Sequence, residues 1–148
     1  MKADNYIKIE FPSRSVNEGF ARAAASAFAA QLDPTLEELG DIRTAVSEAV
    51  TNCIVHAYPE SIGKISLRLR IIDGCTLEIS VKDTGRGIAD VAKAREPLFT
   101  TGGEERSGMG FTIMESFMDR LTVRSKPGRG TTVLMRRALS RRGESRDD

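Results

Sequence analysis

Two stretches of strict apolar–polar alternation, separated by one turn, constrain the fold of this chain most strongly. Apolar residues occupy every second position over residues 65–71 and again over 77–81. Asp73-Gly74, a pair that favours tight hairpin turns, lies between them. Alternation of this kind is typical of strands that bury one face. The sequence therefore predicts an antiparallel hairpin with an apolar face that another layer must cover.

The rest of the chain supplies that layer and the remaining strands. Alternation predicts a first strand over residues 7–11 and a last hairpin of 121–124 with 131–135. Apolar residues at helical spacing predict helices over 16–31, 36–58 and 108–119, with a short helix near 90–95. Ser15 with Glu18, and Thr35 with Glu38, have the spacing of capping boxes at two helix starts. We expect an α/β two-layer sandwich (α+β), in which helices cover one face of a mixed, mostly antiparallel sheet.

Length and charge limit the function classes. A chain of 148 residues is long enough for one domain with a substantial core, which we place at residues 1–137, before a charged tail at 138–148 that we expect to be disordered. The net charge is +1, so no overall basicity points to nucleic acid, and no apolar run approaches the roughly 20 residues of a membrane span. We expect a cytoplasmic protein whose two cysteines, Cys53 and Cys75, are buried reduced thiols.

The long helix carries a second face besides its apolar one. Glu48, Asn52 and His56 follow one another at four-residue spacing, so they share a polar side of the helix. Taken alone, such a face is usually a solvated surface. Small residues around it, Ala45 and Ala49, are compatible with close approach of a ligand.

Three glycine-containing segments follow this helix. The segment DTGRGI, residues 83–88, comes directly after a predicted strand, where it could form a plain turn or, with Asp83, a pocket wall. The segment SGMGF, residues 107–111, opens a predicted helix and would present backbone N–H groups to an anion. It is neither a Walker loop, because no GK[ST] follows, nor a Rossmann fingerprint, because no strand leads directly into it. The third segment, GTT at residues 130–132, begins the last strand.

The order and spacing of these four segments are far more specific than any one of them. Together they resemble the ATP-binding Bergerat fold of the GHKL superfamily, shared by gyrase, heat-shock ATPases, sensor histidine kinases and mismatch-repair ATPases. Within it, the segments SEAVTN, PLFTT and RSGMGFTIMESFMD resemble the anti-sigma F factor family of sporulating bacteria. The resemblance extends over about residues 5–136, nearly the whole domain.

The resemblance implies roles for individual residues. Asn52 matches the Mg²⁺ ligand that bridges to the ATP phosphates, and Glu48 matches the catalytic carboxylate. Asp83 matches the acceptor of the adenine amino group, and Thr131 matches a hydroxyl near the same base. Gly85 and Gly87 match glycines at the adenine wall, and Ser107, Gly108, Met109 and Gly110 match residues whose amides face the phosphates. Thr100, Thr101 and Arg106 match phosphate neighbours in or next to the lid. Arg22 on the first helix matches a partner contact.

The implied function is that of an ATP-dependent protein serine kinase that is also an anti-sigma factor. Its implied partners are an RNA polymerase sigma factor and a small antagonist protein phosphorylated on serine, with ATP and Mg²⁺ as cofactors and no direct nucleic acid or membrane contact. We expect a homodimer. Two alternatives stay open: a general-stress anti-sigma kinase of the same superfamily, and a nucleotide-gated binding module without phosphoryl transfer. The segment of about residues 98–106, which matches the lid of this family, is one residue shorter than expected and contains Gly102-Gly103.

Overall fold

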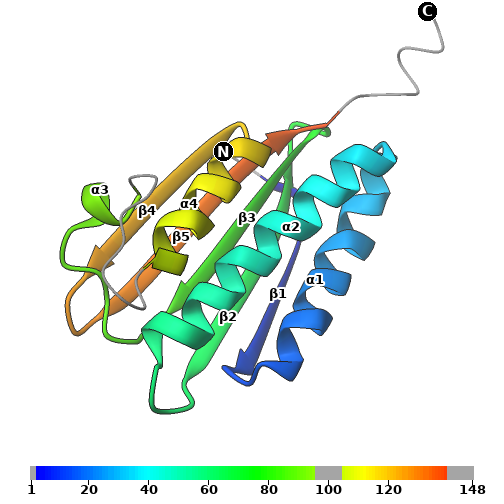
Figure 1. Ribbon diagram of the computed structural model, residues 1–148. Coiled ribbons are helices and arrows are strands. Elements are labelled where there is room, and N and C mark those ends of the chain that lie inside the picture. The colour runs from blue at the N-terminus through cyan, green and yellow to red at the C-terminus, as the bar shows by residue number, and fades with distance from the viewer. Residues whose placement is uncertain (1–2, 96–104, 140–148) are drawn as a thin grey trace, which may run out of the picture.

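The computed structural model describes residues 3–95 and 105–139, leaving aside the side chains of 105–109. It consists of one sheet with helices on one of its faces (Figure 1). The strands are β1 (Ala3–Pro12), β2 (Lys64–Ile72), β3 (Thr76–Asp83), β4 (Arg120–Lys126) and β5 (Gly130–Ala138). The helices are α1 (Val16–Ala29), η1 (Ala30–Leu32), α2 (Leu36–Asn52), η2 (Cys53–Ala57), α3 (Val91–Ala94) and α4 (Glu105–Phe117).

The sheet has the strand order β1-β2-β3-β5-β4, and each neighbouring pair is antiparallel. The predicted two-layer sandwich is confirmed. The parallel pairing that a mixed sheet would require does not occur among these five strands. Helices α1, α2 and α4 lie side by side over the sheet, with α2 in the middle (Figure 1).

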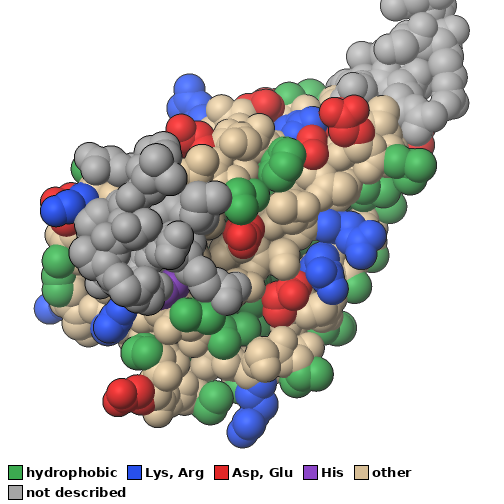
Figure 2. All heavy atoms as spheres, viewed as in Figure 1, with side chains coloured by type: hydrophobic (Ala, Val, Ile, Leu, Met, Phe, Trp, Pro, Cys, Tyr) green, Lys and Arg blue, Asp and Glu red, His purple; other side chains and the backbone are tan. Residues whose placement is uncertain are grey.

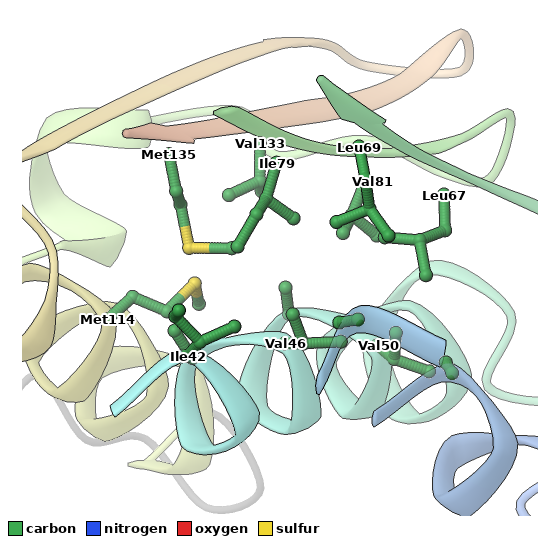
Figure 3. Packing of buried hydrophobic residues seen from close by; sticks show 14 of the residues in the cluster. Ile42, Val46, Val50, Leu67, Leu69, Ile79, Val81, Met114, Val133 and Met135 are labelled. Carbon is green, nitrogen blue, oxygen red and sulfur yellow. The ribbon is translucent and has the colours of Figure 1, made fainter. Parts of the chain in front are cut away.

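Alternation along the strands decides which face the helices cover. Leu67 and Leu69 of β2 point to the same side as Ile79 and Val81 of β3, and all four are at most 1% exposed. Their partners across the layer come from α2 and α4 (Figure 3): Ile42, Val46, Val50 and Met114. The apolar stripe of the long helix is therefore used as predicted, which leaves its polar side free for other contacts.

Helices α1 and α2 begin at the predicted residues, whereas one of the two predicted capping boxes is absent and α4 begins early. Thr35 and Glu38 form the predicted capping box at α2, with bonds of 3.0 and 2.8 Å. Ser15 does not cap α1: its backbone is already helical (φ −58°, ψ −30°), and its side chain makes no capping bond. Helix α4 begins at Glu105, three residues before the predicted start at Gly108, and ends at Phe117 rather than Asp119.

The end of the long helix changes pitch. Residues Cys53–Ala57 form a π-helical turn, η2, in which the Tyr58 N–H donates to the Cys53 carbonyl five residues back (3.2 Å). Turns of this type are frequent at functional sites. At the other end of the domain, β5 reaches Ala138, and Leu139 is buried at 5% exposure.

Candidate functional site

A cavity of about 320 Å³ lies at the C-terminal end of α2. This volume falls in the range of small-molecule sites. Its walls come from α2 and η2, the segment from β3 through α3, the middle of α4, and β5. The lining residues are Ala49, Asn52, Cys53, His56, Ala57, Asp83, Arg86, Gly87, Ile88, Ala89, Asp90, Lys93, Ala94, Phe111, Thr131 and Val133.

Asn52 points from the last turn of α2 into this cavity. Its Nδ2 is buried and has no hydrogen-bond partner among residues 3–95 and 105–139 as the structure describes them. A buried amide without a partner is costly, so a ligand that satisfied it would gain binding energy. Gly110 of α4 leaves the space around the amide: a Cβ there would lie 3.1 Å from Asn52 Oδ1 and 3.2 Å from Nδ2. The amide oxygen is a donor that suits a hard cation such as Mg²⁺.

Asp83 ends β3 with its carboxylate in the opposite wall and is 4% exposed. Its Oδ1 accepts from the N–H groups of Gly85 (3.0 Å) and Thr131 (3.2 Å). Burial raises the pKa of Asp83, and these hydrogen bonds offset part of that rise. The Thr131 hydroxyl is 2.7 Å from Ser125 Oγ, so its position is fixed as well.

Cys53 completes the environment of Asp83 and was not predicted as a site residue. Its Sγ lies 3.4 Å from Asp83 Oδ2, and the residue is 4% exposed. Burial, together with the charge of Asp83, raises the pKa of this thiol well above its usual range, so the thiol is protonated and donates. Sequence spacing gave no signal for this contact, because the apolar stripe accounts for Cys53 as a core residue.

The DTGRGI segment is held close to η2 and to the β4–β5 turn. A Cβ on Gly85 would collide with the Ala57 carbonyl, and the Arg86 N–H donates to that same oxygen (3.2 Å). Gly87 has φ +77°, and a Cβ there would collide with the Lys126 carbonyl. Both glycines are therefore required by the close approach of backbone around the cavity.

Glu48 and Arg22 belong to a second depression. Its volume is about 430 Å³, and it lies between α1 and α2, lined by Arg22, Gly40, Arg43, Thr44, Ser47 and Glu48. Basic and acidic side chains gather over these two helices (Figure 2). Glu48 is half-buried and stands one turn before Asn52. Among the residues that the structure describes, Glu48 is not part of the lining of the first cavity. The Arg22 guanidinium is 3.6 Å from Glu18.

The remaining predicted site residues fall in or next to the lid. Thr100 and Thr101 lie outside the described residues. The first turns of α4 contain Arg106, Ser107, Gly108 and Met109. The structure describes the backbone of these residues but not their side chains. Because only the first N–H groups of a helix lack intrahelical partners, a start at Glu105 leaves those of residues 105–107 available among the described residues. The expectation that Ser107, Gly108, Met109 and Gly110 present their amides to a phosphate stays a prediction.

Comparison with known proteins agrees with this geometry. The histidine kinase-like ATPase domain family matches residues 11–137. An anti-sigma F factor of Caldanaerobacter subterraneus subsp. tengcongensis is 56% identical over 142 residues, covering 95% of this chain and 99% of that protein. The anti-sigma F factor of Pasteuria penetrans is 55% identical, covering 91% of each chain.

Solved structures show the same fold. The RsbU and RsbW domains of Rv1364c from Mycobacterium tuberculosis match with a TM-score of 0.67 at 21% identity, over 93% of this chain and 32% of that one. The Erythrobacter litoralis blue-light activated histidine kinase EL346 matches with a TM-score of 0.60 at 25% identity, over 88% of this chain and 43% of that one.

The sheet, the polar end of α2 and the glycine-bounded cavity define a histidine kinase-like ATPase domain of the GHKL type. Nearly full-length identity above 50% narrows the class further. The chain belongs to the anti-sigma F factor family. Among residues 3–95 and 105–139, no helix is long and apolar enough to cross a membrane.

Proposed function

We propose that this protein is an anti-sigma factor and an ATP-dependent protein serine kinase. It holds a sigma-F-type sporulation sigma factor inactive and phosphorylates a serine of its antagonist protein. The observation that carries the proposal is the convergence of Asn52, Asp83 and Thr131 on one cavity, in a chain 56% identical to an anti-sigma F factor.

ATP fits the chemistry of the two walls. The Asp83 carboxylate accepts from the adenine amino group, and Thr131 lies beside the base. The Asn52 amide oxygen would hold Mg²⁺, and that ion would supply charge neutralisation at the phosphates. The free N–H groups at the start of α4, with Arg106, serve the phosphates. Thr100 and Thr101 in the lid are further phosphate contacts in this proposal.

Phosphoryl transfer requires a serine beside Glu48. The serine Oγ attacks the γ-phosphorus, the bond from phosphorus to the β–γ bridging oxygen breaks, and ADP leaves. The proton of the serine hydroxyl passes to the Glu48 carboxylate as general base. Glu48 in the α1–α2 depression is open to a docked protein, and Arg22 lines the same depression as a partner contact.

The partner cycle follows from charge. A phosphoserine adds about −1.5 to −2 charge, which disrupts a docked surface, so phosphorylated antagonist dissociates and the sigma factor is held again. We propose that the protein acts as a cytoplasmic homodimer.

Transfer of labelled phosphate from ATP tests the proposal directly. Wild-type protein with Mg²⁺–ATP and purified antagonist should label one serine of the antagonist. Glu48→Gln should lower the transfer rate by about 100-fold or more, as loss of a general base does, with the Kd for ATP unchanged. Glu37→Gln, an exposed carboxylate on the same helix, should transfer at the wild-type rate. Wild-type rates from Glu48→Gln would remove Glu48 from the catalytic role.

One observation favours a second function, nucleotide-gated binding without transfer: Glu48 lies outside the lining of the cavity that contains Asn52. In that case ATP would bind and alter affinity for the sigma factor, and no phosphate would reach the antagonist. The same labelling experiment, read beside ATP binding, separates the two functions.

A further inference from the structure

The Asp83 carboxylate has a limited number of acceptor positions. Two carboxylate oxygens offer about four lone-pair sites. Oδ1 accepts two backbone N–H groups, from Gly85 and Thr131, and Oδ2 accepts the Cys53 thiol. One acceptor position on Oδ2 is therefore left for a donor in the cavity that Asp83 lines.

The three donors come from different parts of the fold. Gly85 follows β3, Thr131 belongs to β5, and Cys53 stands where α2 passes into η2. The two backbone donors fix Oδ1 from the sheet side only. Among the described residues, Oδ2 accepts from the Cys53 thiol, which approaches from the helical layer, so this bond limits rotation of the carboxylate about its Cβ–Cγ bond.

We infer that Cys53 is a positioning residue: its thiol holds Asp83 Oδ2 at the angle from which that oxygen accepts the 6-amino group of a purine nucleotide. This inference rests on the proposed ATP site. Packing alone would otherwise explain why Cys53 is buried. If the thiol positions Asp83, then discrimination between purine nucleotides with and without a 6-amino group depends on it, and not only the affinity for nucleotide.

The test compares two nucleotides that differ only at position 6. ATP carries the amino group, and purine riboside triphosphate carries hydrogen. In Cys53→Ala, the ratio of the two Kd values should shrink by about threefold to tenfold, as expected for loss of one hydrogen bond. Cys53→Ser, which keeps a donor on the same Cβ, should restore most of the ratio. Cys75→Ala is the matched control, since Cys75 is half-buried in the β2–β3 turn, away from the cavity lining.

A merely structural role for Cys53 would weaken both nucleotides equally or neither, and an unchanged ratio in Cys53→Ala overturns the inference. Wild-type protein that bound neither nucleotide would instead refute the proposed function.

A measurement on the unmodified chain does not depend on any variant folding. Saturating ATP should slow modification of Cys53 by methyl methanethiosulfonate, followed by mass spectrometry, and leave the rate at Cys75 unchanged. Equal rates at Cys53 with and without bound ATP would place the thiol away from the base and overturn the inference.

Discussion

Glu78 is a charged residue buried on the sheet face opposite the helices. It stands between Arg70 and Arg136, its direct partners on the two neighbouring strands, and its side chain is 2% exposed. The ion-pair distances are 2.7 Å to Arg70 and 2.8 Å to Arg136. Burial raises the pKa of Glu78, but the hydrogen bonds and charges of the two arginines outweigh it, so the pKa lies below its ordinary 4.5.

Glu78→Gln should lower the free energy of unfolding by about 1–3 kcal/mol at pH 7, because two arginines then face each other without a carboxylate. A folded-state pKa below the unfolded value gives stability that is present above pH 4.5 and lost as pH falls through the folded pKa. Urea unfolding of both proteins from pH 7 to pH 3 should show the difference shrinking below pH 4.5. A difference that stayed constant would contradict the ion-pair explanation.

Gly110 and Gly40 form a matched pair of helical glycines. A Cβ at Gly110 would press on the Asn52 amide, whereas a Cβ at Gly40 meets nothing within 4 Å. Gly110→Ala should weaken Mg²⁺-dependent ATP binding by about tenfold, or about 1.4 kcal/mol, by moving the amide. Gly40→Ala should leave binding unchanged and stabilise the protein by about 0.5–1 kcal/mol. The Kd for ATP is measured with and without Mg²⁺ for each variant. An equal gain in ATP affinity on adding Mg²⁺ to both variants would refute the role of the space beside the Asn52 amide.

Single residues were predictable where spacing along one element sufficed. Helical spacing places Asn52 on a polar face, and alternation places Asp83 at the end of a strand, but their roles came from the family resemblance. The thiol contact joins residues 53 and 83 across two layers, so it requires the packing of α2 on the sheet, which no spacing rule contains.

At the scale of elements, two segments share the sequence spacing of a capping box, but only one of them forms the capping hydrogen bonds. Thr35 has an extended backbone (φ −71°, ψ 164°) and accepts from the Glu38 N–H, while Ser15 is already helical and cannot do so. The sequence pattern specifies the side chains of a capping box but not the backbone conformation that it requires.

Thr35→Ala should destabilise the protein by about 1 kcal/mol through loss of that bond, and Ser15→Ala by less than about 0.5 kcal/mol. Thermal or urea unfolding of the two variants measures this. Equal losses would mean that Ser15 caps α1 in solution.

The strands were predicted well because alternation is a local signal. The strand order β1-β2-β3-β5-β4 was not predicted, because it depends on long connections through the helices. The start of α4 was placed too late. Glycines were taken as a helix boundary, whereas Gly110 lies inside the helix, where its missing side chain leaves room for Asn52.

At the scale of the whole molecule, α2 serves two depressions at once. Asn52 at its end, followed by Cys53 of η2, lines the first cavity, while Glu48 lines the α1–α2 depression with Arg22. Under the proposed function, we therefore expect nucleotide binding and partner binding to be separable by mutation while they share one helix.

Arg22→Ala should reduce affinity for the sigma factor and the antagonist by about tenfold, since it removes a half-exposed charge from the partner surface, and leave the Kd for ATP unchanged. Arg129→Ala, an exposed arginine in the β4–β5 turn, is the charge-matched control and should change neither affinity. Calorimetric titration with each partner and with ATP measures both, and parallel losses in ATP and partner binding would contradict the separation.

The π-helical turn η2 has a consequence for how this chain can vary. Cys53 and Ala57 both reach the cavity wall because the turn contains one residue more than an α-helical turn. Deleting one residue from Cys53–Ala57 would restore ordinary pitch and rotate the downstream wall away from Gly85 and Arg86. A change in the length of this segment should therefore disturb the cavity wall more than a substitution that keeps its length.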